Sequence, residues 1–283
     1  MSTFSKSVIA IVAGVLLAAS YSFIQAQNMA AIKFSLGKNI VVTARASGVP
    51  KFSVRNIDGF VSYSVNGIPA DIPAIFDKQG NSITMGPIFA FTMYADRDNV
   101  NDLAVHHVRL QFDSASIKDH AAGQKFVSDL IAQMRTQKWS RYVSNRCPAV
   151  TGRSSLTDIK GLPNPLAGCA LDPDYVLSAS EWQHVMKSGQ LYQWRVAEVL
   201  ATLQIDYREH DTGVSYTIFM EFDDFELKRK LDEKNILLEL SEGDKNGWKS
   251  TELNSQKEKE RAELVKKLES DALLRDDTVV QRK

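Results

Sequence analysis

The chain has 283 residues, of which 44% are apolar and 24% charged, and its 34 basic residues balance 34 acidic ones. An apolar fraction of this size is typical of globular proteins and excludes a chain that is disordered throughout. With zero net charge, the composition shows no excess of basic residues of the kind that binds nucleic acid. Only one segment is apolar enough to cross a bilayer, which excludes a multi-pass membrane protein.

The N-terminal segment is predicted to direct the chain out of the cytoplasm. Lys6 is the only charged residue before Lys33, and residues 8–24 are apolar apart from one glycine and two serines. A positive start, an apolar run and a small residue at a cleavage position, here after Ala26, are typical of a secretory signal peptide. The main alternative is an uncleaved anchor, in which residues 8–24 hold the protein in the inner membrane. Both interpretations predict a periplasmic or secreted protein, whereas a buried helix of a soluble protein would not.

The segment from residue 34 to 113 is predicted to form mainly β-strands. Three stretches carry β-branched or alternating patterns and stop at turn residues, namely 40–44, 60–65 and 88–94. A further strand up to Asp113 places apolar residues on one face, with His106 in register: Ala104, Val108, Leu110 and Phe112.

Helical spacing replaces the strand pattern at residues 117–137. The apolar residues there recur three and four positions apart and form one face: Phe126, Val127, Leu130, Ile131 and Met134. Ser116 and Asp119 are interpreted as an N-terminal capping pair. Farther along, a short helix is predicted to begin at Ser180 and to end at Gly189.

The two cysteines, Cys147 and Cys169, are predicted to form a disulfide. The 21 residues between them are rich in glycine and proline and carry little helix or strand pattern. A disulfide across such a loop restricts the unfolded chain, and an even pair of cysteines in an oxidising compartment usually bonds. There is no C-x-x-C, so neither a redox centre nor a zinc site is indicated.

The clearest pattern in the chain predicts a β-hairpin over residues 199–222. Apolar and polar residues alternate on both arms, with the turn at 209–213, so one face is buried and the other is in water. Strands from 40–113 and 190–222 are expected to share one or two antiparallel sheets, covered on one face by helix 117–137. The predicted fold class of the exported domain, residues 34–222, is therefore α+β.

The C-terminal region, residues 223–283, is predicted to be a charged helical hairpin. Between 223 and 277, 28 of 55 residues are charged, against 40 of the other 228. Two helices, 223–242 and 250–275, carry narrow apolar stripes suited to packing on each other or on a partner. The alternative is a solvated helical appendage supported by ordinary ion pairs along each helix. With residues 1–30 as signal or anchor, the chain thus has three parts.

No recognised catalytic or phosphate-binding motif occurs, since G-x-S-x-G, P-loop, G-x-G-x-x-G and H-E-x-x-H are all absent from the sequence. Four weaker groupings remain. They are a stretch that resembles a calcium loop (Asp96, Asp98, Asp102), three histidines (His106, His107, His120), four carboxylates where a strand meets a helix (Glu221, Asp223, Asp224, Glu226), and two serines with a distant histidine (Ser154, Ser155, His184).

Each grouping is better explained by structure than by chemistry. The calcium-like stretch lacks the glycine and glutamate of a true loop. Adjacent histidines on a strand point to opposite faces, so the histidines should not converge on a metal. The carboxylates suit a helix N-terminus, and no spacing supports the serine grouping. We predict no cofactor, no metal ion and no catalytic residue.

Two classes of function fit the sequence. The first, which we favour, is an exported bacterial envelope protein that binds another envelope protein without catalysis, as an accessory, inhibitor or immunity-type factor; deletion of 246–283 should then remove the partner. The alternative is a cell-envelope hydrolase with a dispersed carboxylate site, because two acids from distant positions suffice for glycoside hydrolysis. The sequence does not identify the partner.

Overall fold

The computed structural model describes residues 30–282, except for residues 79, 98–100, 167, 188 and 212. The predicted signal or anchor at residues 8–24 lies outside the described residues. Among the helices that are described, none is long and apolar enough to cross a membrane.

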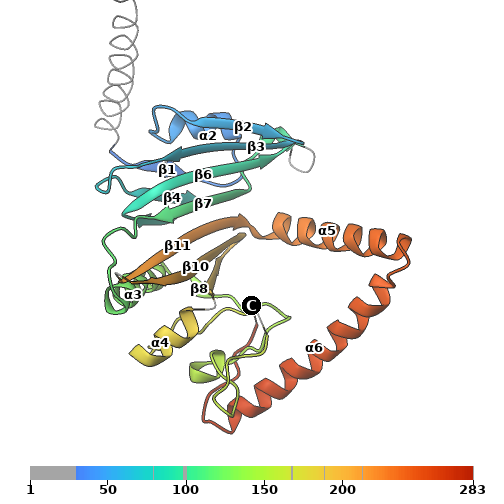
Figure 1. Ribbon diagram of the computed structural model, residues 1–283. Coiled ribbons are helices and arrows are strands. Elements are labelled where there is room, and N and C mark those ends of the chain that lie inside the picture. Colours follow the sequence, from blue (N-terminus) through green and yellow to red (C-terminus); the bar gives the residue numbers. More distant parts are fainter. Residues whose placement is uncertain are drawn as a thin grey trace, which may run out of the picture.

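One large antiparallel sheet carries the fold (Figure 1). Its eight strands lie in the order β2 (Ser53–Ile57), β3 (Phe60–Asn66), β6 (Ile88–Asp96), β7 (His107–Phe112), β11 (Gly213–Asp224), β10 (Val199–His210), β9 (Gln190–Val196) and β8 (Ser140–Arg141). The pairing of β7 with β11 joins the N-terminal strands to the C-terminal hairpin. The predicted α+β class and the shared antiparallel sheet are confirmed.

A smaller sheet and three helices accompany the large sheet. The small sheet has the order β1 (Ile32–Phe34), β4 (Ala74–Lys78) and β5 (Asn81–Met85), with β1 parallel to β4. The three helices are α2 (Ile40–Ala46), α3 (His120–Thr136) and α4 (Ala179–Met186), and 3₁₀ turns occur at Asn101–Leu103 and Gly152–Ser155.

The core lies on one face of the large sheet. Phe222 of β11 stacks on Phe76 of the small sheet, with ring centroids 4.6 Å apart, and Trp182 of α4 donates a hydrogen bond to Tyr216 of β11. Leu130 of α3 is buried in the same cluster. These contacts involve alternate residues of each strand, so the small sheet, α3 and α4 all pack on the same face.

The predicted strand at residues 40–44 is wrong: these residues form helix α2. The Asn39 side chain accepts hydrogen bonds from the backbone N–H groups of Val41 and Val42 and so caps the helix. Burial of Ile40, Thr43 and Ala44, at helical spacing, outweighs the strand preference of the β-branched residues. Here the capping residue predicts the local structure better than the β-branched composition does.

The predicted helix at 117–137 exists but begins later, at His120. Asp119 is itself the N-cap, since its carboxylate accepts a hydrogen bond from the Ala122 N–H, so the proposed pairing with Ser116 is wrong. The buried face contains Val127, Leu130 and Met134, as predicted.

The C-terminal charged region contains helices α5 (Phe225–Lys245) and α6 (Ser250–Leu273), which diverge from their connecting turn (Figure 1). From Asp232 to Glu242, α5 is exposed at every position except half-buried Leu240. The far end of α6 packs Val265 and Leu268 on a small apolar cluster around the disulfide loop. In the charged region, the middle of α5 is therefore exposed, whereas the far end of α6 is packed on the rest of the protein.

Candidate functional site

The face of the large sheet opposite the core carries polar side chains in two continuous rows. Side chains directly opposite each other on neighbouring strands project to the same face. The His107 row runs through cross-strand neighbours from β2 to β11: Arg55, Ser62, Tyr94, His107 and Asp223. The Arg109 row runs beside it: Ser53, Ser64, Thr92, Arg109 and Glu221. We take this open polar face as the candidate site.

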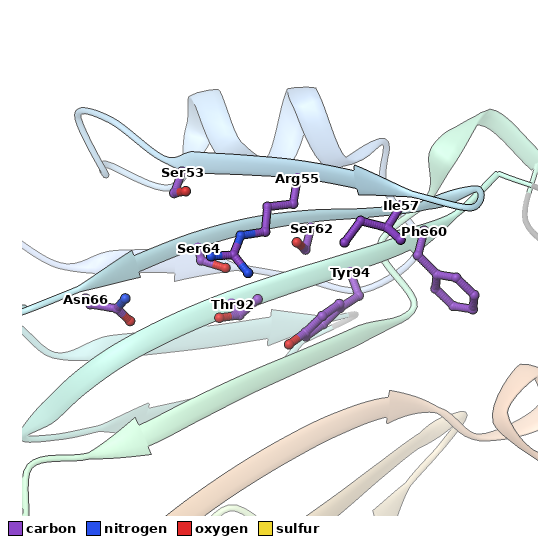
Figure 2. Close-up of a pocket in the computed structure, with 9 residues that line it drawn as sticks. All are labelled: Ser53, Arg55, Ile57, Phe60, Ser62, Ser64, Asn66, Thr92 and Tyr94. Atoms are coloured by element: carbon purple, nitrogen blue, oxygen red, sulfur yellow. The ribbon is translucent and has the colours of Figure 1, made fainter.

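Toward β2 the face is hollowed into a groove of about 490 Å³ (Figure 2). The lining side chains come from β2, β3 and β6 and include no carboxylate: Ser53, Arg55, Ile57, Phe60, Ser62, Ser64, Asn66, Thr92 and Tyr94. Figure 2 shows the Arg55 side chain extending from β2 over the serines of β3. Within the described part of the chain, its guanidinium forms no hydrogen bond or ion pair.

Toward β11 the polar and charged side chains of the same face contact each other. His107 Nδ1 lies 2.8 Å from Oδ1 of the buried Asp223, and Arg109 Nε lies 3.4 Å from Glu221 Oε1. The Arg109 guanidinium also stacks over the Phe219 ring at 3.7 Å, and Gln204 donates to Glu221 at 3.1 Å. Polar groups at the centre of the face thus pair with each other, whereas the Arg55 cation in the groove has no partner within the part of the chain that is described.

The structure does not bring the three histidines together. His107 lies on the open face with Asp223, whereas the ring of His120 lies 2.8 Å from the Tyr216 hydroxyl on the core side. His106 Nδ1 is buried and has no hydrogen-bond partner among the described residues. Burial lowers the pKa of His106, with a smaller lowering by His107 and opposing contributions from nearby carboxylates. No group of His, Cys, Asp and Glu within the described residues could hold a metal ion.

The four carboxylates at the strand-to-helix junction all have structural partners. Glu221 and Asp223 pair with the basic side chains just described, and Asp224 caps α5 by accepting from the Leu227 N–H at 3.1 Å. Glu226 pairs with Arg229 on the same helix. Of the calcium-like stretch, residue 98 lies outside the described residues, and Asp96 is buried.

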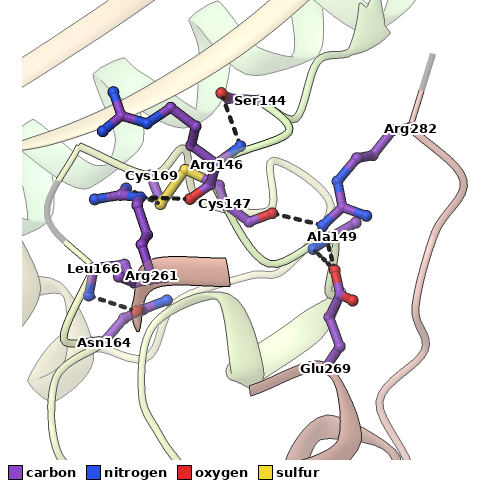
Figure 3. Close-up of a disulfide and its surroundings, with 10 residues drawn as sticks. All are labelled: Ser144, Arg146, Cys147, Ala149, Asn164, Leu166, Cys169, Arg261, Glu269 and Arg282. Carbon is purple, nitrogen blue, oxygen red and sulfur yellow. Dashed lines mark hydrogen bonds and ion pairs between the residues drawn. A yellow bond between two sulfur atoms is a disulfide. The ribbon is translucent and has the colours of Figure 1, made fainter. Parts of the chain in front are cut away.

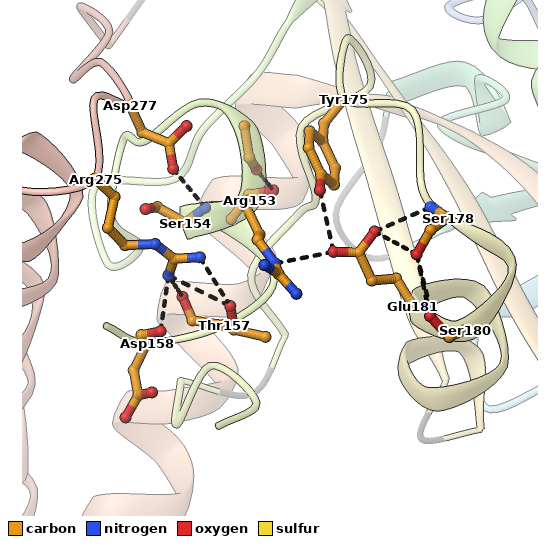
Figure 4. Close-up of polar contacts among 12 residues, drawn as sticks. Arg153, Ser154, Thr157, Asp158, Tyr175, Ser178, Ser180, Glu181, Arg275 and Asp277 are labelled. Atoms are coloured by element: carbon orange, nitrogen blue, oxygen red, sulfur yellow. Dashed lines mark hydrogen bonds and ion pairs between the residues drawn. The ribbon is translucent and has the colours of Figure 1, made fainter. Parts of the chain in front are cut away.

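The two serines have structural roles that do not involve His184. Ser155 Oγ donates to the Gly152 carbonyl and accepts from the Asp172 N–H, while the Ser154 N–H donates to Asp277 (Figure 4). His184 is exposed on α4. The serines therefore help to hold the loop between the cysteines.

A second polar network beside this loop is centred on Glu181 (Figure 4). Burial raises the pKa of Glu181, but the hydrogen bonds from Ser178 and Tyr175 and the nearby Arg153 outweigh it, so the pKa is lowered. The carboxylate closes the capping box of α4. This network is structural.

The predicted disulfide between Cys147 and Cys169 is present, with Cα atoms 5.5 Å apart. Figure 3 shows side chains of α6 and of the C-terminal segment in contact with the loop around this disulfide. Arg261 donates to the Arg146 carbonyl at 2.8 Å, Arg282 donates to the Cys147 carbonyl at 2.8 Å, and Glu269 accepts from the Ala149 N–H at 2.9 Å.

Sequence reasoning missed the groove. The alternation over residues 60–65 already places Ser62 and Ser64 on one side of a strand, but nothing local shows that Arg55 reaches over them. The groove offers hydroxyl groups, apolar side chains and one cation that has no partner among the described residues. No family model, curated protein or solved structure shows a significant match to this chain.

Proposed function

We propose that this is an exported envelope protein that binds another protein without catalysis, through the open face of the large sheet. One observation carries the proposal: within the described residues, this face ends at edge strand β2, all five residues of which are exposed. An uncovered sheet edge offers unpaired backbone groups to a second chain.

Exposed apolar side chains at the same edge support docking. Ile57 and Phe60 are each more than half exposed and line the groove. Val54 is also more than half exposed and projects from the other face of the same strand. Clustered apolar side chains rimmed by polar ones are typical of protein-binding surfaces.

The exposed part of α5 is a second element that could meet the partner. It carries both signs of charge, which would orient a partner and set its rate of encounter more than its affinity. Deletion of 246–283 is a poor test of this role, because α6 and the C-terminal segment also cover the disulfide loop.

The alternative remains a cell-envelope hydrolase with a dispersed carboxylate site, and the His107–Asp223 pair is the observation that favours it. A histidine held by a carboxylate can transfer protons. The groove, however, is lined by no carboxylate. A general acid also needs a raised pKa, whereas the described carboxyl groups with resolved shifts, Glu181 and Asp244, have lowered pKa values.

Site-specific photocrosslinking in cells tests the proposal. A photoreactive amino acid replaces Ser64 in the groove of the full-length protein, and a control replaces Lys266, which is exposed on α6. We expect one crosslinked protein from position 64 and none from 266, with binding then reproduced from purified components. Equal crosslinking at both positions would contradict a role for the open face.

A second measurement separates binding from hydrolysis. Purified full-length protein is incubated with peptidoglycan, alongside the Asp223→Asn variant. The binding proposal predicts no release of soluble fragments by either protein. Release by the wild type that is lost in the variant would establish the hydrolase instead.

A further inference from the structure

We propose that the partner presents an extended, acidic segment that pairs with edge strand β2 as an additional strand and places a carboxylate on Arg55. This inference rests on the proposed function and names the chemistry of the partner at the same site. It joins three features of the β2 edge: its free backbone, its excess of positive charge and the groove beside it.

The backbone of β2 is available on its outer side. Within the described residues, β2 pairs with β3 alone, from Ser53 opposite Ser64 to Ile57 opposite Phe60. In an antiparallel pair, every second residue directs its N–H and C=O away from its neighbour. An extended segment can satisfy these groups, which is how peptides add to exposed sheet edges.

The stretch of chain that leads into and includes β2 has charge of one sign only, although the whole chain is neutral. Residues 30–57 contain five basic residues and no acidic one, and all five are exposed: Lys33, Lys38, Arg45, Lys51 and Arg55. In the described part of the chain, the side chains of these five form no ion pair. The first acid, Asp58, follows the strand at its turn. Of these five, Lys51 lies just before β2 and Arg55 lies on it, so an acidic segment added to this edge would meet positive charge.

The groove determines which side chains of the added segment would contact this protein. Side chains alternate across a strand, so every second residue of the segment would face the groove. A carboxylate there would meet the Arg55 guanidinium, with the hydroxyl groups of Ser62 and Ser64 close by. Arginine binds carboxylates in a two-pronged geometry that a lysine cannot reproduce.

A second copy of this chain is a poorer occupant. Antiparallel pairing of β2 with itself would place Arg55 opposite its own copy if centred on Arg55, or opposite Lys51 of the other copy if centred on Ser53. Like charges placed opposite each other are destabilising. An alternative explanation is that the basic side chains on this edge strand simply prevent it from pairing with another strand. That explanation predicts that the edge binds no added strand.

The test measures fluorescence anisotropy of labelled seven-residue peptides with full-length protein in a non-ionic detergent. The probes are Glu-Val-Glu-Val-Glu-Val-Glu, the same peptide with its central Val replaced by Pro, and a version with Lys in place of Glu. We expect binding of the acidic peptide that weakens with salt. Proline, which removes a backbone donor and disfavours a sheet, should weaken it about tenfold, and the basic peptide should not bind.

Matched charge reversals locate the site. Arg55→Glu should weaken the acidic peptide by about tenfold or more. Arg45→Glu makes the same change of charge on α2, outside the groove, and should have little effect. Equal losses in both variants, or equal binding of the proline peptide, would overturn strand addition in favour of diffuse electrostatic attraction.

Three further outcomes are decisive. Failure of the acidic peptide to bind overturns the inference, while crosslinking from position 64 would still support the proposed function. Binding to phosphatidylglycerol vesicles but not to the peptide would mean that the basic edge contacts lipid. Association of the protein with itself that is lost in the Arg55→Glu variant would identify a second copy as the occupant.

Discussion

The bond between Cys147 and Cys169 closes a loop whose described part contains only one short 3₁₀ turn, so much of its order depends on the cross-link and on contacts from α6. We expect the double replacement Cys147→Ser, Cys169→Ser to lower the free energy of unfolding by about 2–4 kcal/mol, because the unfolded chain gains freedom. Urea denaturation of the full-length protein measures this. Two free thiols in the oxidised protein would refute the bond, and reductant should not affect the double variant.

His106 makes stability depend on pH. Burial lowers its pKa below the ordinary 6.5, so the unfolded chain binds more protons than the folded one when the pH falls below that value. Stability contributed by neutral His106 is therefore present above pH 6.5 and is lost as the pH falls through 6.5 toward the folded pKa. Asp96, Asp223 and Asp224 oppose this shift, and His107 adds to it.

The measurement is the urea midpoint of the wild type and of His106→Gln between pH 7.5 and pH 5. We expect the wild type to lose more stability on acidification than the variant. His184→Gln is the control, because His184 is exposed on α4 and should leave the wild-type slope unchanged. Equal slopes for the wild type and His106→Gln would show that another group carries the dependence.

At the scale of elements, α3 and the large sheet depend on each other for burial. Leu130 is 3% exposed, in the cluster that also contains the inner face of β11. Leu130→Asp would place a charge there without a partner, so we expect loss of cooperative folding. Asp129→Ala is the matched control. Asp129 precedes Leu130 on α3, is exposed, and pairs only with Lys125 among the residues that the structure describes. A soluble Leu130→Asp protein with the wild-type melting temperature would contradict this packing.

For the whole molecule, the proposed function requires export of the described domain. Alkaline phosphatase, which folds to an active form only where disulfides form, can be fused after residue 40 to report on this. We expect an active fusion because the apolar run at residues 8–24 follows a positive start. An inactive but stable fusion would rule out export, and N-terminal sequencing of the protein from cells would show whether the run is removed.

Local patterns in the sequence determined the hairpin of β10 and β11, the apolar face of α3, the disulfide and the two charged helices, because each depends on residues close together in the chain or on a single pair. The tertiary structure decided the rest. Residues 40–44 are helical because Asn39 caps them and because one side of the helix is buried against the core. The groove exists because the register of β2, β3 and β6 places Arg55 beside Ser62, and Ser62 beside Tyr94. Such register is set by burial of the opposite face across the whole sheet, which no local pattern contains.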